Sequence, residues 1–136
     1  MRLEKSIGRQ RKVCAAALAA LASAMTLNAV LTSQVSAQRR SAAESGHATF
    51  EHLCEPCHGD GPGDDGRAML PGTDALRIKY RGALPALLEE RSDLTAEALK
   101  VYVRRGTFSM PPFRPTEITD AEIENIAAYL QESSKR

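Results

Sequence analysis

The chain has 136 residues, a length that indicates one domain rather than several. Its 18 Lys and Arg nearly balance its 17 Asp and Glu, so it lacks the basic surplus of proteins that bind nucleic acid. Three Phe, three Tyr and no Trp leave few large side chains for the core of such a domain.

Residues 1–37 have the pattern of a cleaved export signal. Basic residues are concentrated in the first twelve positions, an Ala- and Leu-rich run covers residues 13–31, and residues 35–37 supply the small side chains of a cleavage site. We expect cleavage after Ala37. The alternative is an uncleaved membrane anchor, which the polar residues that interrupt the apolar run disfavour.

The mature chain is then residues 38–136, with 13 basic and 16 acidic residues and a formal net charge of −3. This acidic charge argues further against a nucleic-acid partner. Cys14 leaves with the signal, so the mature chain contains only Cys54 and Cys57. No unpaired thiol would then be left over in an oxidising compartment such as the periplasm.

The first helix of the mature domain is expected to start at Ala42 or Gly46 and to lead into Cys54. Apolar or aromatic-type side chains recur there at spacings of three and four residues: Ala43, His47, Phe50 and Leu53. Gly46 lies one turn before Phe50 on the same side. We expect this side to pack on the C-terminal helix, with Gly46 allowing a close approach.

The sequence Cys54-Glu55-Pro56-Cys57-His58 is the attachment signature of a c-type haem. Two intervening residues let one helical turn present both thiols to the two vinyl groups of the porphyrin. The next residue, His58, then lies where its imidazole can bind the iron axially. Pro56 fits within this turn, where its missing N–H is not needed.

Three other interpretations fit these residues less well. A zinc site would need His52 or His47 to join Cys54, Cys57 and His58 as ligands. A thioredoxin-like dithiol would need a βαβ pattern, which the sequence does not show. A disulfide between the two cysteines would close only a very short loop and contribute little stability.

The segment after the motif is expected to wrap the haem edge. Residues 59–66 are a Gly- and Asp-rich loop whose aspartates do not follow the order of a calcium loop. A backbone carbonyl at Pro71 or Pro62 is expected to accept a hydrogen bond from the second ring nitrogen of His58, and we favour Pro71. A group of donors follows, from which we expect bonds to the haem propionates, although it also fits a solvated basic surface: Arg77, Lys79, Tyr80 and Arg81.

Two helices are well marked in the C-terminal part. Residues 96–105 form the first, with Thr95 as N-cap and Gly106 after its end, and with Leu99, Tyr102 and Val103 on its buried face. In the last helix Thr119 and Glu122 form a capping box. Its apolar stripe consists of Ile123, Ile126, Ala127 and Leu130. The fold class is therefore all-α.

Met110 is the predicted second axial ligand of the iron. It lies in the loop between these two helices, where Pro111 and Pro112 fix the backbone and reduce the entropy lost on ligation. Met69 lies in a glycine-rich stretch that gives it little support, and we interpret His47 and His52 as solvated or packed side chains. Axial ligation by His58 and Met110 leaves no open iron position, which favours an electron carrier over a haem enzyme or gas sensor.

The mature chain resembles the class I c-type cytochromes over nearly its whole length. The residues that carry this resemblance are Gly46 and Phe50, residues 54–58, Met110-Pro111 and residues 127–130. The resemblance implies a small cytochrome c fold of three to five helices around one covalently attached haem. Electrons would pass at a haem edge bordered by Pro111, Pro112 and Phe113.

A narrower resemblance points to a partner. Residues 79–82, 85–86, 91–95 and 110–117 are similar to the cytochrome subunit of p-cresol methylhydroxylase-type flavocytochromes. In that family the cytochrome takes electrons from a covalent-flavin dehydrogenase that oxidises para-alkylphenols. The expected function is therefore single-electron transfer in the periplasm from a flavoprotein dehydrogenase to a downstream acceptor. The alternatives are a freely diffusing carrier to a terminal oxidase and a haem-based sensor or enzyme.

Overall fold

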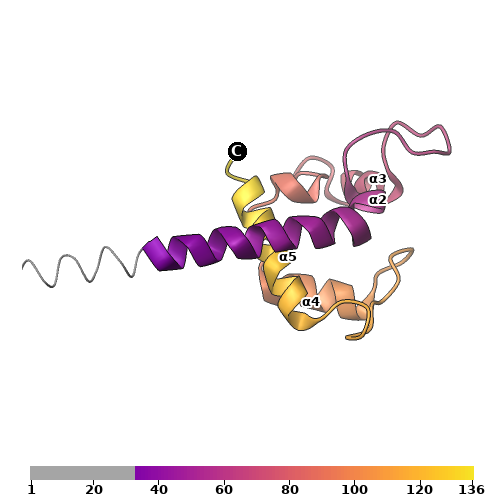
Figure 1. Cartoon of the computed structure of the whole chain (residues 1–136). Helices are drawn as coiled ribbons and strands as arrows, with labels where there is room; N and C mark the ends of the chain where they lie inside the picture. The colour runs from indigo at the N-terminus through magenta and orange to yellow at the C-terminus, as the bar shows by residue number, and fades with distance from the viewer. Residues whose placement is uncertain (1–32) are drawn as a thin grey trace, which may run out of the picture. The chain divides into compact units, whose positions relative to one another are not determined.

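The computed structural model describes residues 33–136, and the elements within that range are helices joined by loops (Figure 1). They are a helix over residues 33–53, α2 (Glu55–His58), α3 (Pro71–Tyr80), the short 3-10 helix η1 (Leu88–Glu90), α4 (Ala96–Arg105) and α5 (Asp120–Ser133). Extended pairing in this part of the chain is limited to one isolated bridge between Thr107 and Met110. The all-α prediction is confirmed.

The proposed signal peptide lies mostly outside the described residues, and its cleavage stays a prediction. Residues Arg39–Arg136 form a compact unit of their own. Within residues 33–136 no helix has both the length and the apolar character needed to cross a membrane.

The first helix starts earlier than its apolar spacing predicted. Residues 33–41 are helical, whereas the sequence indicated a start at Ala42 or Gly46. These nine residues contain no Gly or Pro and are mostly Ser, Gln, Ala and Arg, which a helix accepts readily. They carry no apolar stripe, so periodicity could not detect them.

The helix over residues 33–53 crosses α5 at very short range (Figure 1). A Cβ atom added to Gly46 would lie 2.0 Å from the carbonyl oxygen of Asn125 and 2.8 Å from the backbone nitrogen of Ile126. Phe50, one turn later, is fully buried beside this crossing. The predicted role of Gly46 is confirmed, because only a residue without a side chain lets the two backbones approach so closely.

The helix α4 is capped as predicted, but its buried face is narrower. The Thr95 hydroxyl accepts a hydrogen bond from the Ala98 N–H at 3.2 Å, and Leu99 and Val103 are buried. Tyr102 was expected among them, yet 40% of it is exposed. Its ring instead lies 5.8 Å from the ammonium of Lys79, so it faces a cation on α3.

The helix α5 forms the centre of the core. Its N-terminus has the predicted capping box, with the Thr119 hydroxyl accepting from the Glu122 N–H and the Glu122 carboxylate accepting from the Thr119 N–H. The core around it consists of Ala43, Phe50, Leu94, Leu99, Val103, Ile118, Ile123, Ile126, Ala127, Tyr129 and Leu130.

Tyr129 joins α5 to two other elements. Its hydroxyl donates to the Glu89 carboxylate on η1, and its ring centroid lies 4.5 Å from that of His47 and 5.5 Å from that of Phe50. Burial and the neighbouring Glu89 carboxylate raise the pKa of Tyr129 above its usual value. His47 also lies 3.4 Å from Glu51, so it acts as a packed surface residue.

Replacing Gly46 with Ala tests the helix crossing. Helix propensity alone would make Gly46→Ala stabilising by about 1 kcal/mol. The contact with Asn125 predicts the opposite sign, a loss of about 1–3 kcal/mol in the free energy of unfolding, because the new Cβ overpacks the crossing. Denaturant unfolding of the haem-loaded protein measures this. Ser45→Ala, at an exposed position of the same helix, is the control, and a stabilised Gly46→Ala protein would contradict the account.

Candidate functional site

The attachment motif forms one tight turn at the end of the helix over residues 33–53. The Cys54 carbonyl accepts hydrogen bonds from the N–H groups of Cys57 at 3.1 Å and His58 at 2.9 Å. Both thiols are free, with Cys54 half-buried and Cys57 exposed. Burial and the neighbouring Cys57 raise the pKa of the Cys54 thiol to about 11, so this group is protonated at neutral pH.

His58 is held as a neutral imidazole. Burial lowers its pKa below the ordinary value, because the low-dielectric surroundings disfavour the imidazolium. Its Nδ1 atom is buried and makes no hydrogen bond. A neutral imidazole is the form in which histidine binds iron, and because Nδ1 is enclosed, Nε2 is the nitrogen left for a metal.

The start of α3 fixes the position of this ring. The Thr73 hydroxyl donates to the Gly59 carbonyl at 2.9 Å, which holds α3 against the end of α2. Gly72 thereby lies so close to His58 that an added Cβ would be 2.8 Å from its Nδ1 and Cε1 atoms. The predicted bond from Nδ1 to the Pro71 carbonyl is not formed, and that role of Pro71 stays a prediction.

Met110 closes a short hairpin. The N–H of Thr107 donates to the carbonyl of Met110 at 3.0 Å, and the N–H of Met110 donates to the carbonyl of Thr107 at 2.9 Å. Gly106, with φ of 65°, permits this turn, because a Cβ there would lie 2.5 Å from the Met110 carbonyl oxygen. Met110 is half-buried and packs against the core.

The rest of this loop is fastened to α4. The N–H of Phe113 donates to the carbonyl of Val103 at 2.8 Å. The Arg104 guanidinium donates to the carbonyls of Phe113 at 3.2 Å and Ile118 at 2.8 Å, and to the carboxylate of Asp120 at 2.6 Å. Arg104 was not singled out from the sequence, because its role depends on how the loop returns. Phe113 packs partly against the core, whereas Pro111 and Pro112 are exposed.

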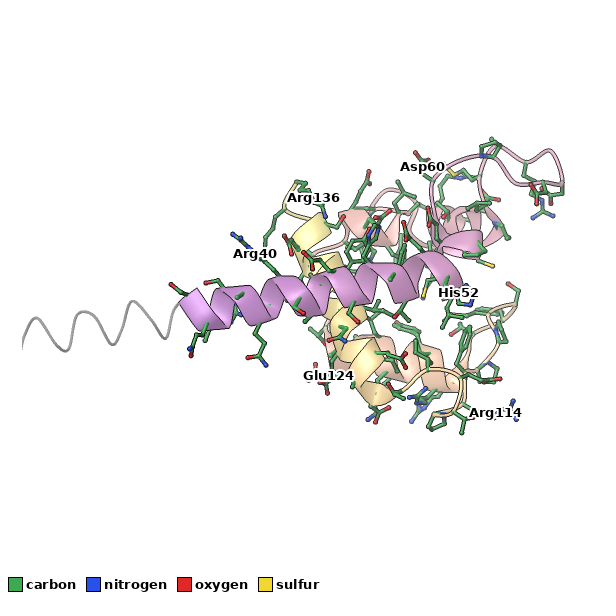
Figure 2. The ribbon with its side chains drawn as sticks, in the orientation of Figure 1. Arg40, His52, Asp60, Arg114, Glu124 and Arg136 are labelled. Carbon is green, nitrogen blue, oxygen red and sulfur yellow. The ribbon has the colours of Figure 1, made fainter. Side chains whose placement is uncertain are left out.

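The attachment turn and the Met110 loop meet the same core at the same end of the helix over residues 33–53. Leu53, Cys54, Met110 and Phe113 all pack against the core cluster. Figure 2 shows His52 at that end of the helix, Asp60 in the loop that follows α2 and Arg114 in the loop that precedes α5. Two thiols, a neutral imidazole and a thioether are therefore available from two segments, and these groups fit a covalently attached haem.

The other candidate ligands find less support. Met69 lies in the loop 59–70, whose internal hydrogen bonds are short-range, such as Gly63 N–H to the Arg67 carbonyl at 2.9 Å. His52 is exposed at the end of its helix. Within residues 33–136 no three His, Cys, Asp or Glu side chains are grouped so as to hold a metal ion, which leaves the zinc interpretation without support.

The predicted propionate donors are used in different ways. Arg77 pairs with Asp74, with its Nε 2.9 Å from the carboxylate oxygen, and Arg81 ends α3 in an exposed left-handed conformation with φ of 50°. The Tyr80 ring lies between the Lys79 ammonium at 4.9 Å and the Arg91 guanidinium at 4.8 Å. The structure thus brings Tyr80 to a partner, Arg91, that sequence reasoning did not include among the donors.

Arg91 is an unusually buried cation, with 5% of its surface exposed. Its Nε donates to the Asp93 carboxylate at 2.9 Å, and this bond lowers the pKa of Asp93 and raises that of Arg91. The neighbouring Arg91 guanidinium also lowers the pKa of the Tyr80 hydroxyl. The carboxylate two residues after Arg91 was the available sequence signal, but the contact with Tyr80 depends on the fold.

Comparison with known proteins identifies a family. A family model described as cytochrome C oxidase, cbb3-type, subunit III matches residues 41–130, a range that includes the attachment turn and Met110. Searches of curated proteins and of solved structures found no match.

The role of Met110 is tested by Met110→Ala. Loss of the thioether should leave the haem covalently attached, remove the sulfur-to-iron charge-transfer band and lower the reduction potential by on the order of 0.1 V. Spectroelectrochemical titration measures both properties. Met69→Ala is the matched control and should behave like the unaltered protein. A Met110→Ala protein with an unchanged spectrum and potential would show that Met110 does not bind the iron.

The cradle around His58 is tested by Gly72→Ala. The added Cβ would displace the imidazole, with an overpacking cost of about 1–3 kcal/mol, and should reduce the haem bound per chain and alter the absorption spectrum. Gly63→Ala is the control, because its Cβ would mainly meet the end of the Asp65 side chain, which can move. Equal haem content and identical spectra for both variants would show that Gly72 does not position His58.

Proposed function

We propose that this chain transfers single electrons between protein partners in the periplasm. The chain belongs to the class I c-type cytochromes of the cytochrome c oxidase, cbb3-type, subunit III family. The family implies covalently bound haem c, and Cys54 and Cys57 fit its attachment motif. When bound, that group supplies an iron centre that changes oxidation state by one electron. The chain is thus a cytochrome c electron-transfer domain, for which we propose the iron ligands, the location and the partners.

The observation that carries the proposal is the pairing of two rigid segments on one core. The turn at residues 54–58 offers two free thiols and a neutral imidazole, and the hairpin at residues 107–110 holds a thioether. In the proposed arrangement Cys54 and Cys57 would hold the haem covalently, and His58 and Met110 would bind its iron. A chain with both axial positions filled transfers electrons and leaves no place for an oxygen or peroxide substrate.

The chain's own residues would keep both axial groups in place during electron transfer. Gly72 and the Thr73–Gly59 bond fix the His58 ring, and Arg104 fastens the loop that carries Met110. A site that moves little between oxidation states needs little reorganisation when an electron arrives or leaves. Exposed Pro111 and Pro112 border the surface through which electrons would pass.

The proposed location is the periplasm, reached through the signal at residues 1–37. The proposed electron donor is a flavin-dependent dehydrogenase of the alkylphenol-oxidising type, on the ground that residues 79–82, 85–86, 91–95 and 110–117 resemble flavocytochrome subunits. The second candidate is a carrier that delivers electrons to a terminal oxidase. The description of the matching family, an oxidase subunit, favours this second role.

One experiment separates the two roles. The full chain is produced in a host that matures c-type cytochromes, and its mass is measured to establish loss of residues 1–37 and gain of one haem. The purified protein is then mixed with the native organism's soluble fraction plus an alkylphenol, or with its washed membranes plus oxygen. Reduction by the soluble fraction, with a co-purifying flavoprotein, supports the flavocytochrome role.

The remaining outcomes are equally distinct. Oxidation by the membranes without reduction by the soluble fraction supports the oxidase-directed carrier and removes the flavoprotein partner. A protein of full-length mass would contradict the cleaved signal. A matured haem protein that exchanges electrons with neither fraction would contradict the proposed roles.

A further inference from the structure

Phe108 is the most exposed large apolar side chain among the described residues. Its surface is fully accessible, whereas the other exposed large hydrophobic residues, such as Ile78 and Tyr102, are at most about half exposed. Its backbone φ is 52°, a left-handed conformation that side chains such as Phe rarely adopt. Two unfavourable features therefore coincide at one residue, and neither contributes to the packing of the described domain.

The hairpin holds Phe108 in this outward position. The two bonds between Thr107 and Met110 leave Phe108 and Ser109 as the two residues of the turn. Gly106 fits under the Met110 carbonyl, and the bond from Phe113 to Val103 anchors the chain on the far side. The aromatic ring is thus presented on a rigid support two residues from the proposed iron ligand, and its exposure does not result from a loose loop.

The charge around this tip is positive although the mature chain is acidic. Residues 100–117 contain Lys100, Arg104, Arg105 and Arg114 but only one acidic residue, Glu117. Lys100 and Arg104 pair with Asp120, and Arg114 pairs with Glu117. Exposed Arg105, three residues from Phe108, has no ion pair within the described part of the chain.

The loop on the other side of the site has the opposite charge. Residues 55–70 contain Glu55, Asp60, Asp64 and Asp65 against a single Arg67. Figure 2 shows Asp60 and Arg114 on these two separate loops. A protein that approaches the Phe108 side therefore meets a local excess of cations, and complementary carboxylates on that protein would guide and orient it.

We propose that the hairpin at residues 106–110 is a docking element for a redox protein that offers an apolar depression edged by acidic side chains. Phe108 enters the depression, and Arg105 pairs with a carboxylate on its rim. The proposal rests on the proposed electron-carrier function, which requires a protein partner. Phe108 lies two residues before Met110 in the sequence. A partner that holds the Phe108 ring is therefore close to Met110, which shortens the path of the electron.

Two substitutions at Phe108 test the anchor. Phe108→Asn removes the aromatic ring and keeps the turn, because Asn tolerates the left-handed conformation better than Phe does. Phe108→Leu keeps an apolar side chain of similar size. Both reduced proteins are first mixed with hexacyanoferrate(III), a small oxidant that needs no docking, and should lose their electron to it at the unaltered rate, with unchanged spectra and potentials.

The docking reaction is then measured with whichever native fraction exchanges electrons with the unaltered protein: the soluble fraction with alkylphenol or the washed membranes with oxygen. Phe108→Asn should raise the KM of this reaction by about tenfold, and Phe108→Leu should recover most of the loss. Added salt should slow the reaction of the unaltered protein, and Arg105→Gln should weaken that salt dependence.

Two results would overturn the docking proposal and leave the proposed electron-carrier function standing. The first is an active unaltered protein whose KM is unaffected by Phe108→Asn, and the second is a reaction that salt accelerates, which would indicate a basic partner surface. If the unaltered, matured protein exchanges electrons with neither fraction, the proposed function fails and the docking proposal fails with it. A changed rate with hexacyanoferrate(III) would show that Phe108 acts on the haem site and not on docking.

Discussion

The backbone contact between the helix over residues 33–53 and α5 is the constraint on which the candidate site depends. The first helix ends in the cysteine turn, and the segment that leads into α5 carries Met110. Because Gly46 lets the first helix lie directly on the backbone of α5, the two segments meet around one core although more than fifty residues separate His58 from Met110. A side chain at Gly46 would push apart the two supports of the site.

Different contacts hold the two sides of the site in place. On the cysteine side, Thr73 joins α3 to α2 and places Gly72 against the His58 ring. On the methionine side, the hairpin and the Arg104 guanidinium replace regular structure with a set of hydrogen bonds. The contacts on the methionine side explain how a loop can carry Met110: the backbone groups of Thr107 and Met110 are paired with each other, as they would be in a regular element.

Local signals in the sequence were sufficient for the fold class, the caps of α4 and α5 and the attachment turn, because each depends on neighbours within a few residues. The close approach at Gly46 involves the distant helix α5, but it was predictable because Gly46 and Phe50 share one side of the first helix. They failed where distant contacts decide. Periodicity predicted that Tyr102 is buried together with Leu99 and Val103, but its ring faces the Lys79 ammonium on α3. The burial of Arg91 involves its contact with the Tyr80 ring, which the sequence does not reveal. Phe108 is exposed because it lies in a tight turn, a position that an apolar side chain does not predict. The early start of the first helix had no apolar pattern to reveal it.

The central claim is that one covalent haem is ligated by His58 and Met110 between these two supports. A crystal structure of the matured, oxidised protein tests it most directly. The account predicts thioether bonds from Cys54 and Cys57, an iron bound by His58 through Nε2 and by the Met110 sulfur, and Gly72 in contact with the His58 ring. An iron ligated by Met69, His47 or His52, or an open axial position with Met110 turned away, would contradict it.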